Sequence, residues 1–218
     1  MSDSARPTFS QLRRDLAQAA SGREGGHESD LLALFRRSGA YLEGHFRLSS
    51  GLHSPGYLQC ALVLQYPRDA EAIGMALGER VRPLAATCVL SPALGGIVIG
   101  QEVARALDVK ALFAERQDGV LTLRRGFTLT PDDKVLVVED VVTTAGSTRE
   151  TMAVAQHCGA RVVGACSMVD RSGGRHGLEI PYVALLPMDL PTYREDECPL
   201  CRHGVPIVKP GSRSRRPG

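Results

Sequence analysis

The chain has 218 residues, of which 43% are hydrophobic and 23% charged, so it can bury a sizeable core and is not disordered as a whole. Trp is absent, and Phe and Tyr number only five each, which argues against an aromatic platform for single-stranded nucleic acid. The net charge of +2 arises from the last ten residues, 209–218, since without them 22 basic and 24 acidic side chains give a net charge of −2. We expect these ten residues to form a solvated, disordered basic tail, not a nucleic-acid or membrane contact.

The sequence shows no sign of a membrane segment. The first ten residues are polar, unlike a signal peptide, and no apolar run approaches the ~20 residues that a membrane span needs. Four of the six cysteines stand singly in apolar or helical contexts, where Cys acts as a small hydrophobic residue. We therefore expect a cytoplasmic protein with reduced thiols and no membrane partner.

The N-terminal part predicts an extension followed by a helix. Residues 1–28 are polar and end rich in glycine, which predicts a flexible extension in which residues 11–20 form a short helix. Asp30 is the expected N-cap of a helix over residues 31–37, where four apolar side chains make one face.

The next segment predicts short strands and then a helix. Residues 41–66 predict short strands, with expected breaks at the Ser- and Gly-rich stretches 49–51 and 54–56. Apolar residues then recur at helical spacing over residues 68–82.

From residue 87 onward, predicted strands alternate with predicted helices. This alternation is typical of an α/β fold with a mostly parallel central sheet flanked by helices, here one domain over residues 29–208. Period-two alternation over residues 120–130 predicts an antiparallel excursion, and Gly159 is the expected helix C-cap. The predicted strands are 87–90, 109–114, 134–138, 161–169 and 182–187, and the predicted helices are 96–107 and 146–158.

The segment 135–148, VLVVEDVVTTAGST, carries the clearest chemical signal. A buried strand leads into Glu139 and Asp140, then into a loop of small and hydroxyl residues at a helix N-terminus. Unpaired N–H groups and the helix dipole favour an anion there, and Gly146 lets the backbone approach it closely. The acids stand at the carboxyl end of a parallel strand, where open α/β sheets bind ligands.

Acids beside a phosphate loop indicate a ribose 5-phosphate ligand, with the phosphate in the loop and the sugar diol on the carboxylates. The chain lacks the glycine patterns of P-loop nucleotide hydrolases and of dinucleotide-binding enzymes, which disfavours both classes. The alternative is an ordinary strand-loop-helix with solvated acids.

This segment resembles the phosphoribosyl pyrophosphate signature of the type I phosphoribosyltransferases. Further segments resemble the orotate phosphoribosyltransferase family within that group, and the likeness spans about residues 30–212. The segments are the base-side motif 44–55, the pyrophosphate loop 91–97, the strand end 169–171, and the C-terminal stretches 198–201 and 209–212.

The resemblance implies a role for each matching residue. Glu139 and Asp140 are expected to bind the ribose diol and to be catalytic, and Arg171 is expected to pair with the orotate carboxylate. Thr143 is expected to contact both the phosphate and orotate. The residues expected to bind phosphoribosyl pyrophosphate are Glu139, Asp140, Val141, Val142, Thr143, Thr144, Ala145, Gly146 and Ser147.

The family's reaction converts orotate and phosphoribosyl pyrophosphate into orotidine 5′-phosphate and pyrophosphate, in the de novo synthesis of pyrimidine nucleotides (UMP). The resemblance also implies Mg²⁺ as cofactor, a homodimer as assembly, and a small hood of N-terminal and C-terminal segments over the sheet.

Several positions depart from the family pattern. Relatives carry lysines where this chain has Ser49 and Gly95, and the loop that follows the next strand, within residues 113–127, has arginines and no lysine. Arg116 is the best substitute for a charge on the pyrophosphate, so we expect it to be catalytic. Two alternatives stay open: a purine phosphoribosyltransferase, which shares the signature loop, and a non-catalytic regulator that senses phosphoribosyl pyrophosphate. The missing lysines and the basic tail favour the regulator, and the lack of a helix-turn-helix before the predicted fold argues against it.

The pair Cys198 and Cys201 has the spacing of two zinc ligands, but a structural zinc site needs four. His203 could be a third ligand, and the sequence shows no fourth nearby, so a reduced pair or a redox-labile bridge is favoured and no metal ligand is assigned. His53 is either a ligand contact or a polar turn residue.

Overall fold

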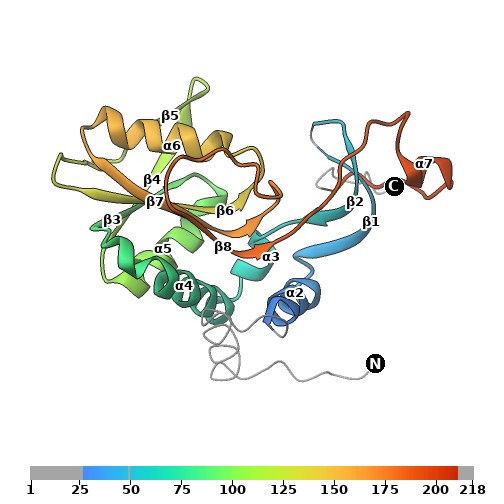
Figure 1. Ribbon diagram of the computed structural model, residues 1–218, viewed down its shortest axis with the longest axis horizontal. Helices are drawn as coiled ribbons and strands as arrows, with labels where there is room; N and C mark the ends of the chain where they lie inside the picture. The colour runs from blue at the N-terminus through green and yellow to red at the C-terminus, as the bar shows by residue number, and fades with distance from the viewer. Residues whose placement is uncertain (1–26, 49, 211–218) are drawn as a thin grey trace, which may run out of the picture.

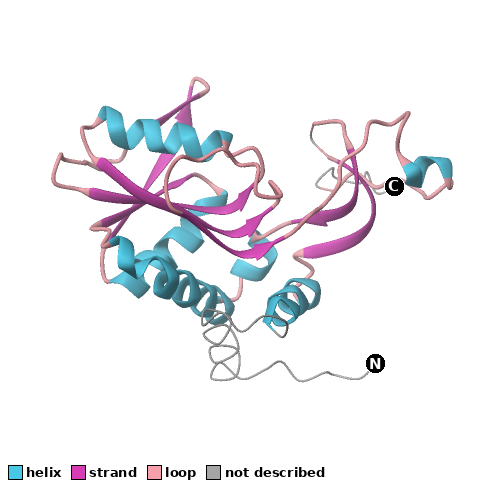
Figure 2. Cartoon of the chain, viewed as in Figure 1, coloured by secondary structure: helices cyan, strands magenta, loops and turns pink. Residues whose placement is uncertain are grey.

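A six-stranded sheet forms the centre of the computed structural model, which describes residues 27–48 and 50–210 (Figure 1, Figure 2). The strand order is β5-β4-β3-β6-β7-β8, and only β5 runs antiparallel to its neighbour. This arrangement confirms the predicted α/β fold. The strands are β3 (Cys88–Pro92), β4 (Lys110–Gln117), β5 (Val120–Leu123), β6 (Lys134–Val142), β7 (Arg161–Asp170) and β8 (Tyr182–Pro187).

Helices cover both faces of this sheet. α4 (Pro67–Val81) and α5 (Gly95–Leu107) lie on one face and α6 (Gly146–His157) on the other (Figure 1). Of the central strands between them, β3 is buried along its whole length and β6 over residues 135–139, which explains their continuous apolar runs. Among the described residues, no helix is long and apolar enough to cross a membrane.

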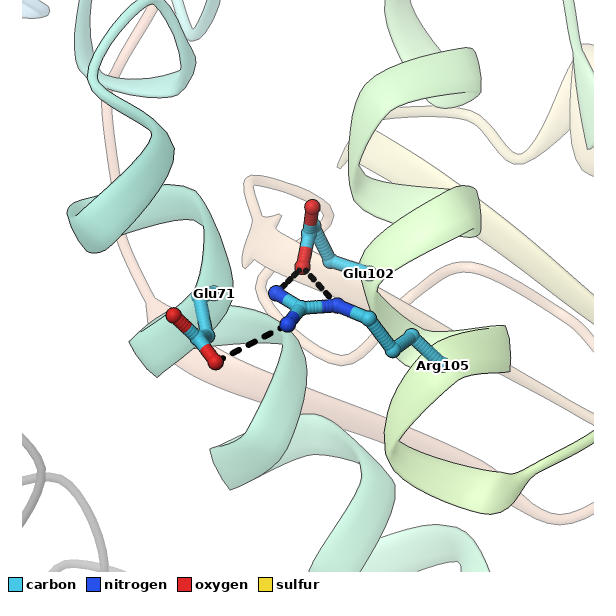
Figure 3. A network of polar contacts seen from close by, with 3 residues as sticks. All are labelled: Glu71, Glu102 and Arg105. Carbon is cyan, nitrogen blue, oxygen red and sulfur yellow. Dashed lines mark hydrogen bonds and ion pairs between the residues drawn. The ribbon is translucent and has the colours of Figure 1, made fainter.

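The helices α4 and α5 pack at unusually close range. A Cβ at Gly74 would overlap Glu102, lying 2.8 Å from its backbone carbonyl carbon, and a Cβ at Gly78 would lie 2.7 Å from the Ala106 Cβ. Arg105 of α5 bonds to Glu102 on its own helix and, at 2.9 Å, to Glu71 of α4 (Figure 3). These ion pairs are exposed and contribute little, so the glycines set the spacing.

We expect Gly74→Ala to destabilise the protein by about 1–3 kcal/mol, because overpacking outweighs the gain in helix propensity of about 1 kcal/mol. Urea unfolding would measure the change. Gly146→Ala is the matched control, because the nearest atom to its built Cβ is Thr144 Oγ1 at 3.6 Å. Equal stability of the two variants would contradict the close packing of α4 on α5.

A second, smaller unit stands beside the sheet and confirms the expected hood. We define the hood as residues 41–48, 50–58 and 188–210: the antiparallel pair β1 (Tyr41–Arg47) and β2 (His53–Leu58), and the C-terminal segment with α7 (Pro199–Arg202). The C-terminal segment returns from β8 and lies against the pair (Figure 1). Backbone bridges join Phe46 to Val208 and His53 to Tyr193. The remaining elements are α2 (His27–Arg37), α3 (Ala61–Leu64) and a 3-10 turn at Arg82–Leu84.

Several predicted boundaries were wrong. The first helix begins at His27, so Asp30 lies inside it and is not its N-cap. The expected break at residues 54–56 lies within β2. The partner strand β1 bulges between Glu43 and Phe46, and Pro55, which has no N–H to donate, falls opposite this bulge.

Other predictions differ only in extent. The antiparallel excursion is confined to β5, since the chain beyond Leu123 forms turns and loops. β6 extends four residues beyond the predicted end at 138 and therefore includes Glu139 and Asp140. The helix predicted at residues 11–20 lies outside the described residues, as do residues 211–218 of the basic tail.

Candidate active site

The predicted phosphate loop joins the end of β6 to the start of α6. Ala145 adopts a left-handed conformation (φ +57°) and α6 begins at Gly146, so the turn strain lies on Ala145 and not on the glycine. Thr143 and Thr144 of this loop are exposed, and a Cβ at Gly146 would meet only Thr144 Oγ1 at 3.6 Å. The loop therefore offers hydroxyl groups and the N-terminus of a 12-residue helix to an anion.

Of the two predicted acids, Glu139 is buried and Asp140 is partly buried at the end of β6. Burial, more than any other cause, raises the pKa of Glu139 to about 7, although Thr148 Oγ1 donates a hydrogen bond to its carboxylate at 3.3 Å. Burial also raises the pKa of Asp140, whose Oδ1 accepts a 2.9 Å hydrogen bond from the Val141 N–H. Two adjacent, largely desolvated carboxyl groups need hydroxyl or cationic partners to carry their charge.

The pyrophosphate loop lies directly against Asp140. A Cβ built at Gly95, the first residue of α5, would lie 2.6 Å from Asp140 Oδ2. The lysine that relatives carry at this position therefore has no room here unless Asp140 moves.

Parallel pairing of β6 with β7 brings the loop and the expected orotate residue together. Val142 pairs with Asp170, and the Arg171 N–H donates a 2.8 Å hydrogen bond to the Val142 carbonyl. Thr143 and Arg171 therefore follow neighbouring strand ends, as the sequence predicted. Burial lowers the pKa of Arg171, and its buried Nε has no hydrogen-bond partner among the described residues.

A cavity of 1160 Å³ lies between these strand ends and the hood. Thr143, Thr144 and Arg171 line it from the sheet side. Tyr57 and Leu58 of β2 line it from the hood side. Glu139 and Asp140 are not among the residues that line it. The other lining residues are Arg47, Leu48, Ser50, Leu52, Arg149, Ser172, Arg175, Asp189, Leu190, Pro191, Thr192, Lys209 and Pro210.

Four cations of this cavity were not predicted as site residues. They are Arg47 of β1, Arg149 of α6, Arg175 of the loop after β7, and Lys209 of the C-terminal segment. Together with Arg171 they give the lining five cationic side chains and a single acidic one, Asp189. The cavity therefore suits a ligand with several negative charges. Arg149, which follows the signature loop directly, is the one that the sequence could have indicated.

Arg116 lies elsewhere. It donates a 2.7 Å hydrogen bond to the Gly119 carbonyl and pairs with Glu150 of α6 at 2.7 Å, and it does not line the cavity. Its expected role on pyrophosphate stays a prediction.

The sequence is similar to that of one known protein family. A family model described as a phosphoribosyl transferase domain matches residues 70–187. The orotate phosphoribosyltransferase of Carboxydothermus hydrogenoformans is 54% identical over 186 residues, 84% of this chain and 97% of that protein. That of Chlorobaculum parvum is 50% identical over 190 residues, 87% of this chain and 98% of that protein.

The fold also matches solved structures. The Mycobacterium tuberculosis H37Rv orotate phosphoribosyltransferase in complex with phosphoribosyl pyrophosphate has a TM-score of 0.60. It is 22% identical and covers 78% of this chain and 94% of that one, a likeness that shows the fold alone.

Proposed function

Because the chain belongs to the phosphoribosyltransferase family, and within it to the orotate phosphoribosyltransferases, we propose that it transfers ribose 5-phosphate from phosphoribosyl pyrophosphate to orotate. The products are orotidine 5′-phosphate and pyrophosphate, and the step belongs to pyrimidine synthesis. One observation supports the choice of base: Arg171 stands at the cavity beside Thr143 with a buried, unpartnered Nε, the partner that a planar carboxylate requires.

The proposed roles follow from position. The hydroxyl and N–H groups of residues 143–147 hold the 5-phosphate, and Glu139 and Asp140 accept hydrogen bonds from the ribose diol. Positive charge develops on carbon-1 as pyrophosphate leaves, and the carboxylates of Glu139 and Asp140 stabilise it. Catalysis by these residues is therefore mainly positioning and electrostatic stabilisation.

Mg²⁺ fits the donors present, since it prefers oxygen ligands and binds through one or two carboxylates together with substrate phosphates. Asp140 and Glu139 are the carboxylates at the sugar site, and the space that a Cβ at Gly95 would fill lies directly against Asp140. When bound, the ion supplies charge neutralisation of the leaving pyrophosphate.

The decisive experiment measures the loss of orotate absorbance with phosphoribosyl pyrophosphate and Mg²⁺. We expect turnover with orotate and none with hypoxanthine or uracil. Turnover with hypoxanthine would favour a purine phosphoribosyltransferase. Tight binding of phosphoribosyl pyrophosphate with no turnover of any base would favour the regulator.

Assembly and location complete the proposal. We propose a homodimer, as the family resemblance implies, which sedimentation analysis would test. We propose a cytoplasmic location because none of the six cysteines, all of which lie among the described residues, forms a disulfide.

We expect Asp140→Asn to weaken phosphoribosyl pyrophosphate binding by about 1.5–3 kcal/mol, the size of a lost hydrogen bond to a charged group. The neutral amide keeps the shape and removes the charge. Titration calorimetry measures the affinity, and circular dichroism checks the fold. Unchanged affinity would remove Asp140 from the sugar site.

We expect Gly95→Ala to weaken the same binding by a similar amount, because its Cβ would displace the Asp140 carboxylate. When Asp140 is already replaced by alanine, the methyl group added by Gly95→Ala has no carboxylate to displace. The double variant should therefore bind no worse than Asp140→Ala alone, and additive losses would contradict the coupling.

A further inference from the structure

Two histidines of the hood meet the two C-terminal cysteines where α7 packs against the β1–β2 pair. His45 lies on β1, His53 on β2, Cys198 immediately before α7, and Cys201 within α7. The first three side chains are buried (3%, 2% and 0% exposed) and the fourth is partly buried. One ligand atom from each lies within 4.8 Å of all the others.

The separate distances match a tetrahedral metal site. His45 Nε2 lies 3.0 Å from His53 Nδ1, and Cys201 Sγ lies 3.3 Å from that same nitrogen. Cys198 Sγ and Cys201 Sγ lie 3.5 Å and 3.7 Å from His45 Nε2. Bonds of about 2.3 Å to sulfur and 2.0–2.1 Å to nitrogen place tetrahedral ligands roughly 3.3–3.8 Å apart. Of these four distances, only the 3.0 Å between the two ring nitrogens would have to lengthen, by roughly 0.3 Å.

A contact outside the four ligands orients one of them. His45 Nδ1 lies 2.8 Å from the Val205 carbonyl oxygen, which can only accept a hydrogen bond. Nδ1 therefore carries the proton, and the lone pair of Nε2 points into the cluster. Metal-bound histidines are held by this kind of backbone hydrogen bond.

We propose that His45, His53, Cys198 and Cys201 bind one Zn²⁺ ion as a closed structural site. Two thiolates and two imidazoles in a tetrahedron are the ligand set typical of zinc. Binding releases the two thiol protons to solvent and requires no oxidant or reductant.

His203, the third candidate of the sequence, does not belong to this site. It is exposed and lies outside the group of four, although it is only two residues from Cys201. The cysteine pair instead meets histidines that are far away in the sequence: His45 precedes Cys198 by 153 residues.

The zinc ion would fasten the C-terminal segment to the β1–β2 pair. Arg47 follows His45 by two residues, and Leu52 precedes His53 directly; both line the cavity. Zinc would therefore hold the wall of the cavity opposite Arg171, without contacting a substrate.

The test begins with the full-length wild-type protein, purified under reducing conditions without a metal-affinity tag. Mass spectrometry of the elements should give about one zinc per chain, as isolated or after one equivalent of Zn²⁺ and dialysis. X-ray absorption should show two sulfur and two nitrogen ligands, and replacement by Co²⁺ should give thiolate charge-transfer absorption. These measurements need no variant and hold even if variants fail to fold.

Matched variants then identify the ligands. Cys201→Ser should lower the zinc content at least tenfold, whereas Cys158→Ser and His203→Ala should keep one zinc per chain. The proposal is overturned if the wild type holds no zinc after reconstitution, if Cys198 and Cys201 form a disulfide under reducing conditions, or if His203→Ala loses the metal and Cys201→Ser keeps it.

Discussion

Replacing Arg171 with alanine is expected to raise the Michaelis constant for orotate by some 30- to several-thousand-fold, far more than that for phosphoribosyl pyrophosphate. Truncating one member of a buried charge pair costs roughly 2–5 kcal/mol, because the other charge is left without a partner. Arg171 has a buried Nε that no described residue satisfies, so the orotate carboxylate would be its partner. Arg171→Lys should recover only part of the loss, because an ammonium group cannot bind a carboxylate bidentately.

Steady-state kinetics in each substrate separately would measure this effect. Arg161→Ala is the matched control, since Arg161 lies at the other end of the same strand, where its side chain is exposed. It should leave both Michaelis constants unchanged. An equal loss for both substrates in Arg171→Ala would mean that Arg171 supports the sheet edge and does not select the base.

The second large effect concerns the stability of the ligand-free protein. Burial raises the pKa of Glu139 to about 7 from an ordinary value of 4.5, so the folded state binds more protons than the unfolded state between these values. The free energy of unfolding therefore falls as pH rises from about 4.5 to 7 and stays lowered above that. A difference of this size corresponds to about 3 kcal/mol.

Glu139→Gln should remove this penalty. At pH 8 we expect the variant to be more stable than the wild type by about 2–3 kcal/mol, and at pH 4 by little or nothing. Its affinity for phosphoribosyl pyrophosphate should fall at the same time. Urea unfolding across this pH range would measure the effect, with Glu179→Gln, at an exposed position, as control. If the variant were destabilised equally at every pH, ionisation of the buried Glu139 would not lower the stability of the wild type.

The strand-loop-helix from β6 to α6 could be predicted because its signals are local. Apolar residues, acids, hydroxyl residues and a glycine follow each other within fourteen positions, and backbone chemistry fixes what each can do. Arg171 could also be placed, because it ends the next strand and neighbouring parallel strands end at one edge of the sheet.

The rest of the site depends on contacts between distant segments. The sequence gives no local reason for Arg47 and Lys209 to meet at one cavity, or for His45 and His53 to surround Cys198. The Ser-Pro-Gly stretch at residues 54–56 reads locally as a turn, and only the bulge in its partner strand explains why it is extended. The close approach of α4 to α5 likewise becomes visible only when Gly74 is seen against Glu102.

The two backbone bridges of the hood bear on the order of folding. Phe46 must find Val208, and His53 must find Tyr193, across a loop that contains the whole central sheet. Closing so long a loop costs entropy that local contacts do not repay, so such pairings form late. On a ribosome the sheet and the phosphate loop can assemble while the C-terminal segment is still being made. The wall of the cavity that faces Arg171 is therefore completed last, and its amide hydrogens should exchange with solvent sooner than those of β6.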